Sequence, residues 1–177
     1  IATRKRASAK EADKSVGSVL VTLKSRDDLQ DIGDLKSKTV AAGLPDSVPG
    51  WLAALGEVQK AGFDPDEFFA KSEFLFEYYP EILASLWGGK ADVAVLPTCM
   101  LEALEKDGLV ATDQLKVLHD KSDEALACKR STDLYPDLSL VGFSWTPEKM
   151  ARDVTVALMS QKTDAPYEWL SYVSHAN

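Results

Sequence analysis

The chain has 177 residues, of which 45% are hydrophobic and 27% are charged, a composition typical of a soluble globular protein of one or two domains. Its formal net charge of −8 argues against duplex DNA or an anionic membrane surface as a general partner. A small anion stays compatible with this charge, because a local cluster of backbone N–H groups can bind one. No apolar run approaches the roughly 18–20 residues that span a bilayer. The chain begins with Ile1 rather than Met, so we expect a processed or trimmed product.

The first two thirds of the chain alternate between strand and helix patterns. Residues 1–16 are basic, small and polar, and predict a short strand followed by a loop. Further strands are predicted over 17–23, 38–44, 73–77, 91–96 and 115–120. Helical patterns separate them, over 28–32, 46–62, 79–89 and 97–108. Alternation at such short intervals predicts βαβ units on a parallel sheet, and Val19 and Val21 should share one face of it.

The last third departs from this alternation. Residues 124–132 predict a strand that heads elsewhere, and 139–145 predict another strand. A helix over 146–161 would have Thr146 as its N-cap and Pro147 at its first position. A short aromatic helix over 165–173 is expected to close the chain.

Two cysteines are the most reactive side chains of the sequence. Cys99 and Cys128 form no CxxC or zinc pattern, and the two histidines add none, so no metal site and no cofactor are expected. Cys99 should lie in the first turn of a helix that follows a strand, where exposed N–H groups lower the pKa of a thiol. A buried space-filling side chain and a structural disulfide are the alternatives, and spacing alone leaves them open.

Two strand-to-helix turns before Cys99 also carry candidate ligand-binding residues. Ser47 stands where a helix N-cap belongs, and Gly50 permits close approach of the backbone to an anion. Ser47 could equally serve as an ordinary cap, and Pro49 removes one N–H donor. At the next turn, Tyr78 or Tyr79 would line a cleft or would pack on the neighbouring strand.

Three stretches of the chain resemble the periplasmic phosphonate-binding protein family: "LKSKTVAAGLPDSVPGWL", "AGFDPDEFF" and "ILASLWGGKADVAVLPTCMLEAL". The likeness covers roughly residues 15–160. It is closer to the sensor domains of tetrathionate-sensing histidine kinases, which share two cysteine motifs matched here by Pro97, Cys99, Leu101, Glu102, Cys128, Ser131, Thr132, Leu134, Tyr135 and Pro136.

The resemblance implies an α/β, two-lobed periplasmic-binding-protein-like fold with a ligand cleft. Residues 1–25 would be part of the first lobe with a crossover strand, 26–120 the complete second lobe, and 121–177 the return to the first lobe. Members of the family carry a substantial segment before the position of residue 1, so the first lobe would be only partial here. A half-built lobe leaves apolar surface uncovered, and we therefore expect a homodimer or a domain swap.

The resemblance also assigns roles to the candidate residues. The turn holding the phosphonate would supply Ser47, Val48 and Gly50, followed directly by Trp51. The other ligand-binding candidates are Tyr78, Tyr79, Thr98, Cys99 and Cys128, with Cys128 on a strand that crosses back between the lobes. Two thiols flanking one cleft suit a sulfur–sulfur ligand, or a reversible disulfide that reports redox state.

These expectations describe a periplasmic sensor domain that binds a small anion, for example a sulfur oxyanion, and signals to a histidine kinase. The alternative is a solute-binding subunit that works with the permease of a phosphonate-type ABC importer. A thiol-based oxidoreductase is disfavoured, because the sequence has no CxxC, no general base close to either cysteine and no Gly-rich nucleotide fingerprint. We expect no enzymatic activity in this domain and no nucleic-acid partner.

Overall fold

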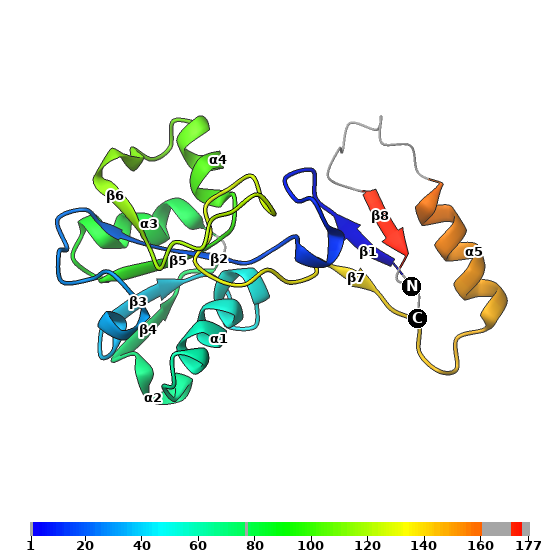
Figure 1. Ribbon diagram of the computed structural model, residues 1–177, viewed down its shortest axis with the longest axis horizontal. Coiled ribbons are helices and arrows are strands. Elements are labelled where there is room, and N and C mark those ends of the chain that lie inside the picture. Colours follow the sequence, from blue (N-terminus) through cyan, green and yellow to red (C-terminus); the bar gives the residue numbers. More distant parts are fainter. Residues whose placement is uncertain (1, 77, 161–170, 175–177) are drawn as a thin grey trace. The chain divides into compact units, whose positions relative to one another are not determined.

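The computed structural model describes residues 2–76, 78–160 and 171–174 (Figure 1). By its internal contacts the chain divides into two compact units. The larger unit consists of 17–122 and 128–133, and the smaller unit takes 1–16, 123–127 and the segment from 134 onward. The lobe boundaries expected from the sequence, at 25/26 and 120/121, differ from these divisions and stay a prediction about the complete domain.

A five-stranded sheet forms the centre of the larger unit, in the order β4-β3-β5-β2-β6. Its strands are β2 (Ser18–Leu23), β3 (Thr39–Ala42), β4 (Lys71–Phe74), β5 (Val93–Pro97) and β6 (Leu115–Leu118). β3 is parallel to β4 and β5, as predicted, but β2 is antiparallel to both β5 and β6. The prediction of a wholly parallel sheet is therefore wrong, because the connection from β2 to β3 contains only the short η2 and no crossover helix that would return the chain to the edge where β2 begins.

Helices cover both faces of this sheet (Figure 1). They are η2 (Ile32–Leu35), the π-helical η3 (Val48–Leu52), α1 (Ala53–Lys60), α2 (Pro65–Phe68), α3 (Tyr79–Trp87), α4 (Met100–Lys106) and η4 (Thr112–Gln114). Val19 and Val21 point to the face that α3 and α4 cover, as predicted, while Leu20 packs with α1 on the other face. Alternation along each strand thus fills two cores and gives a three-layer arrangement.

The smaller unit contains a three-stranded antiparallel sheet in the order β7-β1-β8. Its elements are β1 (Ala2–Lys5), η1 (Ala12–Lys14), β7 (Ser139–Leu140), α5 (Glu148–Met159) and β8 (Ser171–Ser174). Asp137 accepts hydrogen bonds from Arg4 at 2.6 and 2.9 Å and from Arg6 at 2.8 Å. Burial alone would raise the pKa of Asp137, but the hydrogen bonds from the two guanidinium groups outweigh it and lower that pKa.

Several elements of the last third differ from the prediction. Residues 124–132 form no strand; Leu126 makes an isolated bridge to Ala9, and the polar groups after it bond to other elements. The strand predicted over 139–145 is reduced to β7. Pro147 occupies the N-cap position of α5 rather than its first turn, and Thr146 instead accepts the N–H of Phe143 through its hydroxyl.

The prediction of an aromatic helix at the end of the chain is also wrong for the residues that the structure describes. Residues 171–173 belong to β8, which pairs with β1, so strand pairing outweighs the local helical pattern. Residues 165–170 lie outside the described part of the chain. Among the described residues no helix is long and apolar enough to cross a membrane.

Candidate ligand-binding site

The candidate residues of the larger unit gather at one edge of its sheet. β3, β4, β5 and β6 all run in one direction, so their carboxyl ends meet at the same edge, where β2 begins. Ser47 follows β3, Tyr78 follows β4, and Thr98 and Cys99 follow β5. Open α/β sheets bind ligands outside the carboxyl ends of their strands, which makes this edge the candidate site.

Unusual backbone conformations mark the same edge. Phe76, Cys99 and His119 have φ values of 53°, 68° and 49°, and each lies one or two residues after the end of β4, β5 or β6. Residues other than glycine adopt the left-handed region at a cost, and such residues cluster at functional sites. None of the three positions was predicted, because a sequence pattern does not report φ.

Ser47 caps the helix as predicted, and the cap limits what the turn can offer to a ligand. Its hydroxyl accepts the N–H of Gly50 at 3.1 Å, and Pro49 has no N–H. Val48 opens the helix, where an N–H has no acceptor within the helix itself, so its N–H is the candidate donor of this turn. A Cβ on Gly50 would lie 2.8 Å from the hydroxyl oxygen of Ser47, so a larger residue at this position would displace the capping side chain.

Hydrogen bonds join this turn to the neighbouring segments of the edge. The hydroxyl of Ser18 donates to the carbonyl of Pro49 at 2.8 Å, and the N–H of Ser18 donates to the hydroxyl of Thr132 at 2.9 Å. Ser131 donates its N–H to the carbonyl of Ser18 at 2.8 Å. The turn after β3, the start of β2 and the segment 128–133 therefore form one connected structure.

Two of the predicted ligand contacts are buried instead. Trp51 is only 6% exposed, and its ring centroid lies 5.5 Å from that of Phe69 and 5.3 Å from that of Phe74, so it belongs to the core. Thr98 is 3% exposed, and its hydroxyl accepts the N–H of Gly17 at 3.2 Å. Trp51 packs in the apolar core and Thr98 is hydrogen-bonded in the interior, and these positions explain both residue types without a ligand.

The sequence left open whether Tyr78 or Tyr79 lines a cleft or packs on the protein, and the structure shows a different environment for each. Tyr79 is the first residue of α3 and packs partly buried against the core on the α3 side. Tyr78 precedes that helix and is 64% exposed, so it is the tyrosine that can meet a ligand from the larger unit. The neighbouring Phe76 is also exposed, and sequence reasoning missed it.

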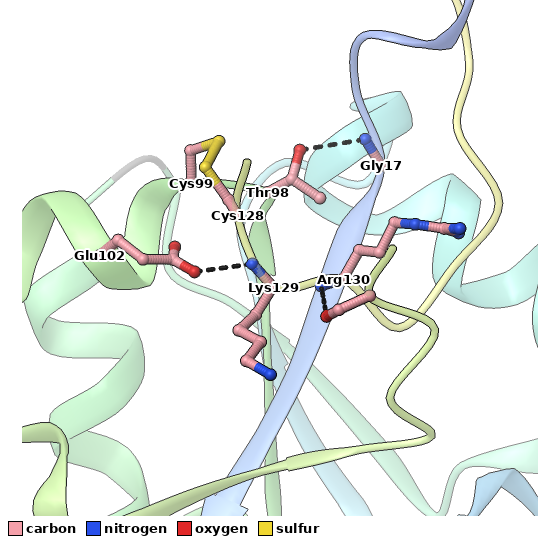
Figure 2. The surroundings of a disulfide bond; sticks show 8 residues. Gly17, Thr98, Cys99, Glu102, Cys128, Lys129 and Arg130 are labelled. Atoms are coloured by element: carbon pink, nitrogen blue, oxygen red, sulfur yellow. Dashed lines mark hydrogen bonds between the residues drawn. A yellow bond between two sulfur atoms is a disulfide. The ribbon is translucent and has the colours of Figure 1, made fainter. Parts of the chain in front are cut away.

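Cys99 and Cys128 form a disulfide, and both residues are half-buried (Figure 2). The sequence left a functional thiol, a buried space-filling side chain and a disulfide open, and the structure contains the disulfide. Cys99 is the N-cap residue of α4 rather than part of its first turn. Cys128 lies in the irregular segment 128–133 and not on a strand, because that segment bonds to the edge of the sheet through single residues.

A charged cluster that the sequence did not reveal anchors the same segment from another side. Glu57 of α1 is 3% exposed and accepts hydrogen bonds from Lys121 at 2.7 Å, Lys60 at 3.1 Å and the N–H of Asp133 at 3.0 Å. Burial alone would raise the pKa of Glu57, but these hydrogen bonds outweigh it and lower that pKa. An open pocket of about 290 Å³ beside the cluster also includes His119, and in the described part of the chain no three His, Cys, Asp or Glu residues are grouped to hold a metal ion.

Comparison with known families identifies the kind of protein. The family model described as the periplasmic substrate-binding protein of phosphonate ABC transporters matches residues 1–170. The chain belongs to this phosphonate-binding family. The family model describes a substrate-binding protein, which agrees with the prediction of a binding domain.

Individual relatives of the family add detail. The chain is 28% identical over 162 residues to the tetrathionate sensor histidine kinase TtrS of Salmonella typhimurium, a match that covers 90% of this chain and 26% of the kinase. A binding-protein component of an ABC phosphonate transporter from Pseudomonas aeruginosa has a TM-score of 0.57 at 19% identity, covering 97% of this chain and 55% of that chain. PhnD1 of Prochlorococcus marinus, solved in complex with methylphosphonate, has a TM-score of 0.58 at 14% identity, covering 98% and 65%.

These structural similarities confirm the predicted fold class, a mixed α/β periplasmic-binding-protein fold. The chain spans about a quarter of the length of the sensor kinase and little more than half to about two thirds of the solved binding proteins. It therefore corresponds to part of the fold, as the sequence suggested.

Proposed function

We propose that this chain belongs to the extracytoplasmic sensor domain of a histidine kinase, and that the domain binds a small anion at the carboxyl edge of the larger unit. The observation that carries the proposal is the 28% identity to a tetrathionate sensor kinase along 90% of the chain, within a family of periplasmic binding proteins. Binding would signal by favouring one conformation of the domain, and only to the extent that the anion has a higher affinity for that conformation.

The turn at Ser47 supports an anionic ligand. Helix η3 continues directly into α1, so an uninterrupted helical segment begins at Val48 and ends at Lys60. The positive end of its dipole lies at Val48, whose N–H is the candidate donor, and both features favour negative charge. Exposed Tyr78 and Phe76 at the adjoining turn would provide an aromatic wall for the rest of the ligand. A sulfur oxyanion is the ligand we favour, because the related kinase is a tetrathionate sensor.

The alternative is a solute-binding subunit of an ABC importer, which the description of the family and the solved relatives favour. The two roles need the same binding site and differ in the partner, a histidine kinase or a permease. The full gene distinguishes them, since a sensor continues into a transmembrane segment and a kinase domain. Either role places the protein in the periplasm.

Self-association stays a proposal that the smaller unit supports. None of the described side chains of α5 is buried, and the stacked rings of Phe143 and Trp145 are exposed nearby. Exposed apolar side chains that gather on one surface usually mark a place that another protein segment covers. Sedimentation velocity over a dilution series tests for a homodimer, which should dissociate on dilution, whereas a single concentration-independent species of monomer mass would contradict it.

The anion site can be tested with a pair of substitutions at one position. Pro is tolerated at the first position of a helix, and Ser47 before it has an extended backbone (ψ 122°) that suits a following Pro. Val48→Pro should therefore remove the N–H and leave the helix intact, while Val48→Ala keeps the N–H and serves as the matched control. The measurement is the thermal melt with tetrathionate, thiosulfate, methylphosphonate or sulfate added.

An anion that binds the native state stabilises it by about 2.7 kcal/mol at a hundredfold excess over its dissociation constant. We expect such a shift for the unsubstituted chain and for Val48→Ala, and a much smaller one for Val48→Pro. A full shift in Val48→Pro would contradict the assigned site. No shift with any anion would contradict anion binding by this chain.

A further inference from the structure

We propose that Cys99 and Cys128 form a redox-active site whose reduced dithiol is oxidised to the observed disulfide by a small anion that contains a sulfur–sulfur bond. The choice of oxidant rests on the proposed function, whereas the exchange chemistry depends only on the two cysteines. The reaction is stoichiometric, with one oxidation for each reduced protein molecule, so it makes the pair a covalent sensor of the anion rather than the centre of an enzyme.

The Cys99 side of the bond is held in place by contacts that do not involve sulfur. Thr98 accepts the N–H of Gly17 through its hydroxyl at 3.2 Å (Figure 2). It also donates its own N–H to the carbonyl of Gly17 at 2.9 Å. Both residues are buried. Reduction of the disulfide would leave this pair of hydrogen bonds intact and would keep Cys99 at the end of β5.

The Cys128 side is held independently as well. Lys129 donates its N–H to the carboxylate of Glu102 at 2.7 Å (Figure 2). Arg130 donates its N–H to the hydroxyl of Ser122 at 3.2 Å. The next residue, Ser131, bonds to β2 through its N–H and its hydroxyl. The Cα atoms of the two cysteines, 5.0 Å apart in the disulfide, would therefore stay close in the dithiol.

Two thiols fixed side by side react as an intramolecular pair, which raises the effective concentration of the second thiol far above that in an unfolded chain. Their setting also makes the disulfide reducible. Both cysteines are half-buried and neither is enclosed in the core, and disulfides that solvent reaches are the more labile ones. Cys99 holds a left-handed backbone (φ 68°), a strained conformation of the kind that clusters at switch sites.

The proposed reaction with tetrathionate balances without a further reactant. One cysteine thiolate attacks a central sulfur of tetrathionate, a cysteine–thiosulfate adduct forms, and one thiosulfate leaves with the electron pair of the broken bond. The second thiolate attacks the cysteine sulfur of the adduct, the Cys99–Cys128 bond forms, and a second thiosulfate leaves. Two thiols lose two protons to the solvent and two electrons to the anion.

The test uses the full chain, reduced with a dithiol that is then removed under anaerobic conditions. Tetrathionate is added to the native protein and to the same protein unfolded in urea, with sulfate as the unreactive control anion. We expect both thiols to be lost and two thiosulfate ions to be released per chain, at least tenfold faster in the native protein. Cys99→Ser and Cys128→Ser, each with one thiol, should release one thiosulfate and keep the adduct, visible by mass spectrometry.

Native oxidation no faster than in urea would overturn the proposal, because the fold would then not position the pair. Loss of the near-ultraviolet circular dichroism on reduction would overturn it too, since the disulfide would then be a structural staple. The double variant Cys99→Ser/Cys128→Ser separates the two claims. If it is still stabilised by anions while the dithiol fails to react, the redox proposal fails and anion binding stands. If the dithiol reacts while no anion stabilises the double variant, the redox proposal stands and anion binding fails.

Discussion

Removal of the disulfide should lower the stability of the chain and leave its native structure in place. Cys99 and Cys128 are 29 residues apart in the sequence. The chain-entropy relation for a cross-link that closes a loop of this length gives about 3.6 kcal/mol at 25 °C, because the cross-link restricts the unfolded chain. The double variant Cys99→Ala/Cys128→Ala should therefore lose about 3–4 kcal/mol in its free energy of unfolding.

Urea unfolding followed by circular dichroism measures this loss, and the unsubstituted chain with and without reductant provides the comparison. The aromatic bands of the near-ultraviolet spectrum in the absence of urea should be kept, because hydrogen bonds from Thr98 and Ser131 hold both cysteine segments to β2 and its start. A loss below about 1 kcal/mol would refute the entropic reasoning. Loss of the native spectrum would show that those hydrogen bonds are not sufficient to hold the two cysteine segments in place.

Three other substitutions test the contacts around the site. Glu57→Gln removes the buried carboxylate from two lysines that keep Asp133 as a partner, and should cost about 2 kcal/mol by urea unfolding, against less than about 0.5 kcal/mol for Glu67→Gln on the exposed surface of α2. Hydrogen bonds from two lysines lower the pKa of Asp133 from 3.8 to about 2, so its contribution to stability is complete above pH 3.8 and is lost as the pH falls toward 2. Over that range the urea midpoint of Asp133→Asn should fall less steeply with pH than that of the unsubstituted chain. An equal slope in the two proteins would contradict this. Gly50→Ala should break the Ser47 cap and lower stability by about 1 kcal/mol, whereas an unchanged melting temperature would show that the turn can adjust.

The sequence predicted the local structure of the larger unit well, because that structure depends on short-range physics. Ser47 before an apolar helical pattern indicated an N-cap, and the alternation of Val19, Leu20 and Val21 indicated which side chains share a face. The direction of β2 could not be predicted in the same way. Strand direction depends on how the chain enters the sheet, and the sequence of the strand itself carries no signal for it.

Contacts between distant residues account for what the sequence could not predict. The Cys99–Cys128 bond requires Cα atoms about 4.4–6.8 Å apart, a distance that a separation along the chain does not reveal. Of the hydrogen-bond partners of Glu57, Lys60 lies close to it in the sequence, while Lys121 and Asp133 lie more than sixty residues away. Trp51 was predicted at the ligand because it follows the Ser47 turn, but η3 turns it toward the rings of the core.

The central claim is that an anion binds the turn after β3 at the carboxyl edge of the larger unit. Its most direct test is a titration of the ¹⁵N-labelled chain with tetrathionate, followed by the amide resonances in two-dimensional NMR spectra, with sulfate as the control anion. The account predicts saturable shifts that are largest for the amides of Val48 and Gly50 and extend to Tyr78 and Cys99. Saturable shifts confined to residues outside this edge, or no shifts at all, would contradict it.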